Sequence, residues 1–278
     1  MSISRLPAWH RPFRYSLFAF VFLFAANRVI AQEHDDDHDH DHDHLHFSHP
    51  MVTESPSPDT KIRLDYVRVW TTGLDAATVN EARAEAEYGF TPSISLAVVT
   101  PFVWVTDPAG DRVSGLGNIE LSLKAAKIAS EEHNILIGGG LSAGLPTGND
   151  AKGIGSGHLI ELEPFVDAAY KVNALEFVGF ARVSSIFRRR AGEENERLLA
   201  FDFSALYRLN PAVEALLEAT TSRSLVGAER GIPQTFVAPG VKVYPFTNKQ
   251  IMFGASVLFG TGLVSDTRGA LVSAFYHF

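Results

Sequence analysis

The last ten residues of the chain, 269–278, most constrain the fold that it can adopt. Alternate positions place apolar side chains on one face of a predicted strand: Ala270, Val272, Ala274, Tyr276 and Phe278. The last strand of an outer-membrane β-barrel has this pattern, because lipid-facing apolar residues alternate with lumen-facing ones and aromatic residues gather at the membrane interfaces. For this segment taken alone, an edge strand of a soluble β-sandwich is the alternative.

Residues 1–31 are organised like a secretory signal peptide. Arg5, Arg11 and Arg14 precede an apolar run at 17–26, and Val-Ile-Ala follows at cleavage spacing. The run has about half the length that a membrane-spanning helix needs, so we expect a cleaved signal and a mature chain that begins at Gln32. An uncleaved anchor helix is the alternative. The chain contains no cysteine, which excludes disulfides and cysteine-based metal sites.

Residues 32–60 are predicted to be a disordered periplasmic tail. Positions 34–49 hold seven histidines and six aspartates, a composition that cannot supply a hydrophobic core. Imidazole and carboxylate groups are ligands for Zn²⁺, Cu²⁺ or Ni²⁺, and a flexible segment can gather four of them. We expect weak, multi-site metal binding, most simply of zinc, with no cofactor required; a solvated acidic linker is the alternative. The candidate metal ligands are His34, His38, His40, His42, His44, His46, His49, Asp39, Asp41 and Asp43.

Residues 61–278 alternate in polarity with a period of two almost throughout, which predicts an all-β domain. In 81–88, for example, three glutamates and an arginine share one face, while three alanines and Tyr88 share the other. Hydrophobic residues make up 46% of the chain, and an inner-membrane helical protein would be far more apolar. Twelve strands are predicted, at 61–71, 78–90, 93–105, 117–128, 134–146, 158–170, 174–187, 197–209, 212–222, 233–245, 250–261 and 269–278.

The connections between these strands alternate between short and long. Turns of two to four residues fall near 91, 130, 171, 210 and 247, and longer loops fall at 106–116, 147–157, 188–196, 223–232 and 262–268. This alternation is typical of a transmembrane antiparallel up-and-down β-barrel with short periplasmic turns and longer outside loops. An even strand count places both termini in the periplasm. Proline inside a predicted strand cannot donate to the ladder, so we expect Pro101, Pro164 and Pro239 to occupy bulges or strained positions.

Two glycine-rich segments carry a family resemblance. Residues 114–121 read SGLGNIEL, and residues 137–149 read IGGGLSAGLPTGN. They resemble the GLGD and LPTG motifs of the outer-membrane transporter-like family named after the MetA pathway of phenol degradation, with Asn118 at the usual aspartate position. The resemblance implies an outer-membrane barrel and leaves the substrate open. Physically, the glycines allow a sharp turn and strong strand curvature, and Pro146 ends a ladder before an outside loop.

The polar faces of the strands are expected to line the barrel lumen, with twelve acidic and six basic residues. Because buried charges must be paired or hydrated, either cross-strand ion pairs fill the lumen or an acidic path favours cations. The acidic candidates are Asp65, Glu81, Glu85, Glu87, Glu120, Glu161, Glu163, Asp167, Glu176, Asp202, Glu214 and Glu218. The basic candidates are Arg63, Arg83, Lys124, Arg182, Arg208 and Lys242.

These features predict an outer-membrane channel or transporter-like barrel for a small solute, with a metal-binding tail. The alternative is a non-conducting binding or scaffold barrel that buffers or senses divalent metal. Expected partners are outer-membrane lipid, the barrel assembly machinery, and a small solute or metal ion. A basic stripe for nucleic acid is missing from the sequence. Outside the signal and tail the histidines are His133, His158 and His277, none in a hydrolase motif, so we expect no enzymatic activity.

Overall fold

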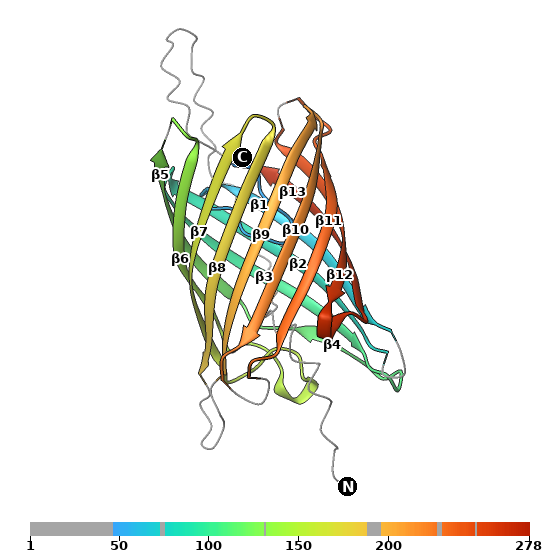
Figure 1. The fold of residues 1–278 in the computed structure, drawn as a ribbon. Helices are drawn as coiled ribbons and strands as arrows, with labels where there is room; N and C mark the ends of the chain where they lie inside the picture. Colours follow the sequence, from blue (N-terminus) through green and yellow to red (C-terminus); the bar gives the residue numbers. More distant parts are fainter. Residues whose placement is uncertain (1–46, 73–75, 131, 188–195, 227–229, 248) are drawn as a thin grey trace.

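The computed structural model describes residues 47–72, 76–130, 132–187, 196–226, 230–247 and 249–278, which form a closed antiparallel β-barrel (Figure 1). Neighbouring strands pair in sequence order, and β1 pairs with β13 from Lys61↔His277 to Thr71↔Thr267, which closes the wall. The wall strands are β1 (Lys61–Thr71), β2 (Thr78–Thr91), β3 (Ile94–Thr106), β5 (Glu120–Ser130), β6 (Ile135–Gly144), β7 (Ile160–Val172), β8 (Leu175–Phe187), β9 (Glu196–Asn210), β10 (Val213–Ser224), β11 (Pro233–Val243), β12 (Ile251–Thr261) and β13 (Thr267–His277).

All twelve predicted strands are confirmed, and their ends lie within three residues of the predicted ones. The sequence did not predict β4 (Arg112–Leu116), which pairs only with the distal part of β3 and extends that hairpin at the end of the barrel opposite the C-terminus (Figure 1). It also did not predict two short 3-10 helices, η2 (Asp150–Lys152) and η3 (Gly262–Val264), in the long loops. Among the described residues, no helix is long and apolar enough to cross a membrane.

The outer face of the wall is apolar, as the alternation predicts. Leu64, Phe253 and Val272 are about half exposed, whereas the residues next to them in sequence are buried on the inner face. Monomeric soluble proteins rarely expose apolar surface on this scale, so the apolar outer face of the wall is the lipid-facing surface of a membrane barrel. We call the end where β1 begins and β13 ends the terminal rim, and the other end the loop rim. Aromatic residues at the terminal rim include Tyr88, Phe90, Tyr170, Tyr207, Tyr276 and Phe278.

The connections at the two rims differ in length as predicted. At the terminal rim β2–β3, β7–β8 and β9–β10 are joined by two residues each, and Asn173 in one of these turns has a φ of 54°. Asparagine tolerates this left-handed conformation better than most residues, which suits it to such a turn. Most connections at the loop rim are longer, and the one between β6 and β7 spans 145–159. The short turn predicted near 247 is the exception, because β11 and β12 are joined by residues 244–250, a longer connection than 262–266 between β12 and β13.

The sequence predicts bulges or strained positions at Pro101, Pro164 and Pro239, and the structure places none of the three in a bulge. The register of the β7–β8 ladder is the same before and after Pro164, and the register of the β11–β12 ladder is the same on both sides of Pro239. Each proline falls where paired residues are missing from one ladder, so its lack of an N–H group costs no hydrogen bond there. Pro101 lies where β3 changes partner from β5 to β4. The strand register shifts elsewhere, in the β2–β3 ladder at Gly89/Thr91, in the β5–β6 ladder at Ile128/Ser130 and in the β9–β10 ladder at Val213/Glu214.

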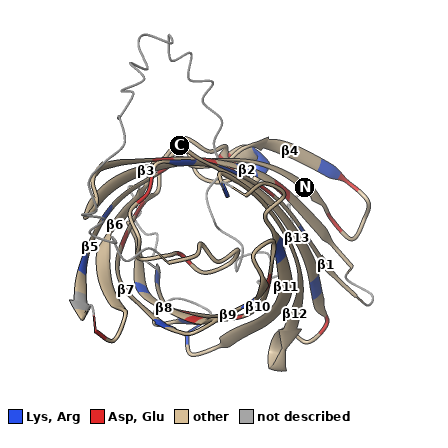
Figure 2. Ribbon diagram, turned by 90° about the horizontal axis from the view of Figure 1, so that it is seen from above, with Lys and Arg blue, Asp and Glu red and all other residues tan. Residues whose placement is uncertain are grey.

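Residues 47–60 differ from the prediction of a disordered tail, which is wrong for this part of 32–60. They lie inside the barrel, and the view down its axis shows a strap of chain within the ring of strands (Figure 2). Phe47, Met51 and Thr53 are at most 1% exposed. We call residues 47–60 the plug. The predicted signal peptide and residues 32–46 lie outside the described residues, so those predictions stay predictions.

Candidate functional site: the lumen and its plug

The plug is held chiefly by one carboxylate on the barrel wall. Glu218 of β10 is fully buried, and it accepts hydrogen bonds from the backbone amides of Met51, Val52 and Thr53 at 3.0–3.3 Å. The Ser204 hydroxyl of β9 donates to the same carboxylate at 2.8 Å, and its Oγ lies 2.6 Å from Thr53 Oγ1. Hydrogen bonds to an ionised acceptor contribute about 1.5–3 kcal/mol each. Glu218 therefore satisfies three consecutive plug amides that the wall would otherwise leave without partners.

A second set of charged groups fixes the start of the plug. Lys242 Nζ donates to the His49 carbonyl at 3.0 Å and pairs with Glu214 at 2.5 Å. Glu214 also accepts from Ser48 Oγ at 3.3 Å, while the Ser48 amide donates to Glu176 at 2.8 Å. Lys242 and Glu214 are at most 1% exposed. Each charge is therefore stabilised by the other and by contacts with the plug, and not by water.

Apolar contacts complete the docking of the plug. Phe47 and Met51 belong to one buried cluster with inward-facing wall residues that include Leu136, Val178 and Leu206. A Cβ on Gly254 would lie 2.5 Å from the Met51 sulfur, so the glycine leaves the space that the methionine fills. Full burial of each of these two side chains contributes about 1.5–3 kcal/mol. In a lumen filled only with water these inward-facing apolar wall residues would be exposed to it, and the plug buries them by supplying an apolar partner.

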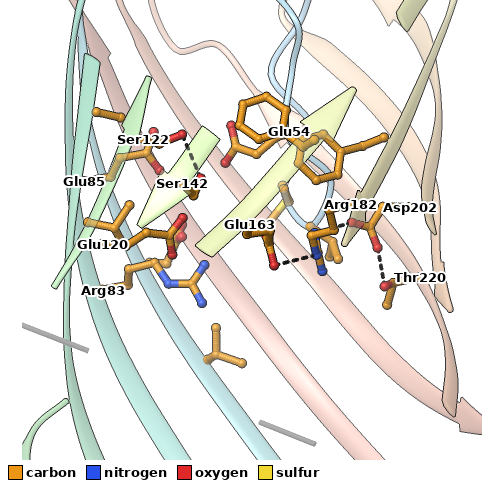
Figure 3. A pocket seen from close by; sticks show the side chains of 18 of the residues that line it. Glu54, Arg83, Glu85, Glu120, Ser122, Ser142, Glu163, Arg182, Asp202 and Thr220 are labelled. Atoms are coloured by element: carbon orange, nitrogen blue, oxygen red, sulfur yellow. Dashed lines mark hydrogen bonds and ion pairs between the residues drawn. The ribbon is translucent and has the colours of Figure 1, made fainter. Parts of the chain in front are cut away.

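A cavity of about 220 Å³ lies in the lumen beyond the plug, with Met51, Val52 and Glu54 forming part of its lining (Figure 3). Sites that enclose drug-sized ligands are typically about 300–1,000 Å³. With the plug in place, the cavity therefore suits only a small solute. One part of its lining is apolar and aromatic, including Phe165 and Phe180, whose stacked rings are 5.1 Å apart.

The remaining lining of the cavity is strongly acidic. Nine acidic side chains and three basic ones line it, which is a formal excess of six negative charges. The acidic residues are Glu54, Asp65, Glu81, Glu85, Glu87, Glu120, Glu161, Glu163 and Asp202, and the basic residues are Arg83, Lys124 and Arg182. Carboxylates from neighbouring strands face one another across a small space, which raises the local concentration of cations.

Ion pairs neutralise part of this charge. Arg182 lies between Asp202 at 2.6 Å and Glu163 at 3.6 Å, in the row that Figure 3 shows. Nearer the terminal rim, Lys61 pairs with Glu87 at 2.6 Å and with Glu85 at 3.3 Å. Each of the two interpretations of the lumen is therefore met in part. Ion pairs lie both beside the plug and in the cavity lining, and carboxylates still outnumber cationic groups around the cavity.

The structure places the predicted lumen residues on the inner face. Seventeen of the eighteen candidates are buried inside the barrel or line the cavity: Arg63, Asp65, Glu81, Arg83, Glu85, Glu87, Glu120, Lys124, Glu161, Glu163, Asp167, Glu176, Arg182, Asp202, Glu214, Glu218 and Lys242. Arg208 lies close to the terminal rim, 3.5 Å from Glu176, with its side chain 38% exposed. Sequence reasoning missed Lys61 and Glu54. Lys61 could have been found from the alternation, because it lies on the same strand face as Arg63 and Asp65. Glu54 belongs to the plug, which the sequence did not predict.

The two glycine-rich motifs form a clamp at the loop rim, which agrees with their structural interpretation. Asn118 Oδ1 accepts from the amides of Gly148 at 3.0 Å and Ser156 at 2.6 Å, and Ile119 donates to Thr147 Oγ1 at 3.1 Å. An amide oxygen thus accepts the bonds that an aspartate could accept at this position. A Cβ on Gly148 would lie 2.3 Å from the Ser156 nitrogen, which explains why the motif has glycine there.

The same loop brings together Ser156, His158 and Asp150, residue types that some hydrolases use. Asp150 accepts from His158 Nδ1 and from Ser156 Oγ, both at 2.8 Å. Burial works against the charged form of Asp150, but these hydrogen bonds outweigh it and lower its pKa. The Ser156 hydroxyl therefore donates its hydrogen bond to a carboxylate. In a nucleophilic serine the hydroxyl donates to a basic nitrogen instead. The cluster is a loop-stabilising network.

The predicted metal ligands are divided by the structure. His34, His38, His40, His42, His44, His46, Asp39, Asp41 and Asp43 lie outside the described residues. His49 is described, and it is buried in the plug instead of lying in a tail. Its imidazole faces Asp59 and His277, two residues that the sequence did not group with it.

Comparisons with known proteins agree with this geometry. A family model described as MetA-pathway of phenol degradation matches residues 66–273. An outer-membrane channel from Pseudomonas putida F1 superposes with a TM-score of 0.62 at 11% identity, covering 80% of this chain and 96% of its own. The NanC porin has a TM-score of 0.55 at 11% identity, with coverages of 77% and 100%. The KdgM porin, solved with disordered oligogalacturonate, has a TM-score of 0.51 at 12% identity, with coverages of 78% and 99%. None of the curated proteins compared with the chain matches it.

Proposed function

Since the chain belongs to the MetA-pathway phenol-degradation family and has the fold of outer-membrane channels and porins, we propose that it is an outer-membrane channel for a small solute. The observation that carries this proposal is the acidic cavity inside a closed, lipid-facing barrel. We place the protein in the outer membrane of a Gram-negative-type bacterium, with the terminal rim at the periplasm. Its partners there are the surrounding lipid, the barrel assembly machinery during insertion, and the solute.

The lining supports passage of cationic solutes. Carboxylates in the lining outnumber the basic groups even when Lys61 and Arg63, which pair with three of them at 3.3 Å or less, are counted. This excess attracts cations and opposes an anion such as the oligogalacturonate found with the KdgM porin. The stacked Phe165 and Phe180 add an apolar surface, so an organic cation can contact a carboxylate and an aromatic ring in the same cavity.

The plug supports a closed resting state. Residues 47–60 fill the lumen next to the terminal rim. Their backbone is hydrogen-bonded to Glu218, Lys242 and Glu176, and the Ser48 hydroxyl donates to Glu214. Passage through the barrel requires these contacts to break. The same plug is the observation that favours the alternative, a non-conducting barrel that buffers or senses divalent metal, because a permanently docked plug leaves no path.

Reversal potentials of the purified protein in planar bilayers test the proposal. Under a tenfold KCl gradient we expect a potential of cationic sign, approaching the roughly 59 mV limit for a monovalent ion. Glu120→Gln combined with Glu163→Gln, both in the cavity lining, should lower it. Glu132→Gln, the same chemical change on an exposed turn at the terminal rim, is the matched control and should leave it unaltered. Equal permeability to both ions would refute the cation path, and a barrel that never conducts would establish the non-conducting alternative.

The His- and Asp-rich residues 34–46 are proposed to bind divalent metal, with zinc the simplest candidate. The proposal is supported by the six histidines and six aspartates of this stretch, whose imidazole nitrogens and carboxylate oxygens suit such ions. This binding would supply no chemistry for the passage of the solute and would not be needed for the barrel to fold.

A further inference from the structure

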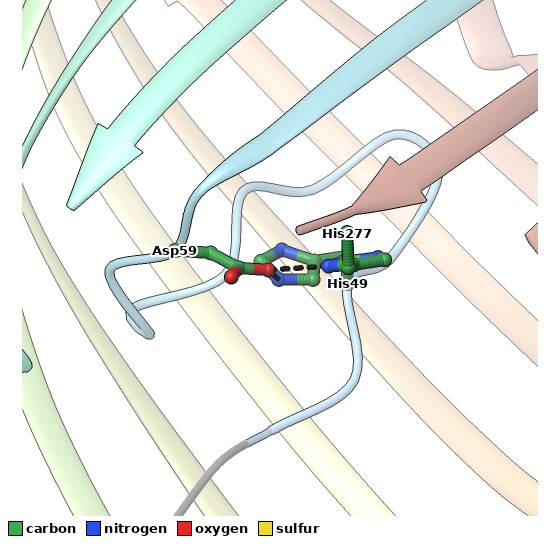
Figure 4. A group of neighbouring side chains, drawn as sticks. All are labelled: His49, Asp59 and His277. Atoms are coloured by element: carbon green, nitrogen blue, oxygen red, sulfur yellow. Dashed lines mark hydrogen bonds and ion pairs between the residues drawn. The ribbon is translucent and has the colours of Figure 1, made fainter. Parts of the chain in front are cut away.

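Three polar side chains from separate parts of the chain meet where the plug joins the terminal rim (Figure 4). His49 belongs to the plug, Asp59 precedes β1, and His277 ends β13. Asp59 Oδ2 lies 3.1 Å from His49 Nε2 and 2.5 Å from His277 Nδ1. One potential ligand atom of each residue lies within 4.8 Å of the other two. From these contacts we propose that His49, Asp59 and His277 bind a divalent transition-metal ion of the zinc class, which fastens the plug to the barrel.

The donor set has the chemistry of such a site. Two imidazole nitrogens and one carboxylate oxygen suit zinc, and a site with three protein ligands leaves a fourth tetrahedral position for water. Zinc binds these ligands at about 2.0–2.2 Å, which separates neighbouring ligand atoms by roughly 3.4 Å. The two imidazole nitrogens lie 3.1 Å and 2.5 Å from Asp59 Oδ2, so these pairs need to part by about 1 Å or less. The two nitrogens lie within 4.8 Å of each other and need to adopt the same separation of roughly 3.4 Å.

The surroundings orient these ligands. The Thr60 amide donates to Asp59 Oδ1 at 2.7 Å, which leaves Oδ2 turned toward the histidines. The His277 amide donates to the Gln250 carbonyl at 2.8 Å, and Lys242 holds the His49 carbonyl at 3.0 Å. The Thr60 contact is an outer-shell hydrogen bond to a ligating group, which fixes ligand direction and strengthens metal sites, and the other two contacts fix the main chain of each histidine.

Lys61 adds one requirement to the site. Its ammonium lies 3.3 Å from His49 Nδ1, so in the metal-free protein Nδ1 accepts and Nε2 carries the proton that faces Asp59. Coordination through Nε2 places the imidazole proton on Nδ1 instead. The Lys61 ammonium must then turn fully toward Glu87, which it already contacts at 2.6 Å. No net proton is released by this exchange, because the proton moves from one ring nitrogen to the other.

The consequence of binding follows from where the three residues lie. His277 ends a wall strand and Asp59 lies at the end of the plug, two residues before β1, whereas His49 lies ten residues before Asp59 near the start of the plug. An ion that bridges them adds a cross-link between the plug and the wall. This part of the inference rests on the proposed channel function, whereas metal binding itself does not.

Zinc titration calorimetry on the full chain tests the site, in a background where the six histidines between 34 and 46 are replaced by asparagine. We expect one zinc ion per chain. His49→Gln and His277→Gln should each weaken binding by more than the roughly 10–100-fold that loss of an outer-shell partner costs. His133→Gln changes an exposed histidine at the same rim and should have no effect. No zinc binding in the background protein, or binding unchanged by both ligand substitutions, overturns the site.

Folding and gating readouts keep the test decisive. His277 ends the closing strand, so heat-modifiable migration must show that each variant still forms the barrel; His49 lies outside the wall, and its substitution tests the site without touching strand pairing. Zinc should lower the open probability of the background protein but not of His49→Gln. One-to-one binding with unchanged gating would overturn the fastening role and leave the metal site standing. Calorimetry needs no conductance, so a barrel that fails to conduct can still show the site.

Discussion

Glu218→Gln should release the plug. The Glu218 carboxylate accepts hydrogen bonds from three consecutive plug amides and from Ser204, with no exposed surface. Glutamine replaces one of its two acceptor oxygens by an NH₂ group, which faces donors, and it converts the remaining charge-assisted bonds into neutral ones. A hydrogen bond to a charged group is worth about 1.5–3 kcal/mol and a neutral one about 0.5–1.5 kcal/mol. The three amides together therefore lose about 3 kcal/mol, which corresponds to roughly a 150-fold shift toward the undocked plug.

Single-channel recording in planar bilayers measures this shift as open probability. Glu163→Gln is the matched control, because it removes the same charge from the lumen. Glu163 pairs with Arg182 on the wall and not with the plug. We expect Glu218→Gln to raise the open probability strongly and Glu163→Gln to leave it near that of the parent. An open probability that is the same in the parent and in Glu218→Gln would refute the assignment of Glu218 as the anchor of a gating plug.

Two further predictions concern the ends of the chain. Deletion of Phe278, whose amide donates to the Thr60 carbonyl at 3.1 Å and whose ring packs against Tyr276, should reduce the heat-modifiable folded barrel in outer-membrane fractions. Normal folding and location of the truncated protein would show that this residue does not support closure. Zinc binding by residues 34–46 should weaken as the pH falls through about 6.5, where free imidazole takes up a proton and can no longer bind metal. Calorimetry at pH 7.5 and pH 5.5 checks this, and equal affinity at both values would count against imidazole ligands.

The strands could be predicted from the sequence because their physical signal is local. Alternation with a period of two places Glu85 and Glu87 inside and Tyr88 outside without knowledge of any other strand. The same rule placed most lumen charges correctly. It could not say which charges pair, because Lys61 meets Glu87 only through the register of β1 with β2.

The plug could not be predicted because its partners are distant in sequence. Glu218 bonds to amides some 166 residues away, and residues 47–60 themselves show no periodicity and several prolines. Composition alone therefore indicated disorder. A weak signal was present in the wall, where Val178, Leu206 and Leu216 face inward although a lumen filled only with water and charge would favour polar residues. Inward apolar residues near one rim indicate that something apolar docks there.

The metal-ligand prediction shows the same limit. Composition grouped His49 with the histidines before it, whereas the fold brings it to Asp59 and to His277, 228 positions farther along the chain. Barrel closure places the start of β1 beside the end of β13, and that juxtaposition is a property of topology that no local pattern contains.

A disulfide between the plug and the wall tests the central claim most directly. The chain has no cysteine, and Thr53 Oγ1 lies 2.6 Å from Ser204 Oγ, so Thr53→Cys with Ser204→Cys can form one defined cross-link. Conductance is recorded first in the oxidised protein and then after addition of a reductant to the same bilayer. We expect channels that stay closed when oxidised and open after reduction, and we expect each single-cysteine variant to be insensitive to the reductant. Equal conductance before and after reduction of a fully cross-linked protein would contradict closure by the plug.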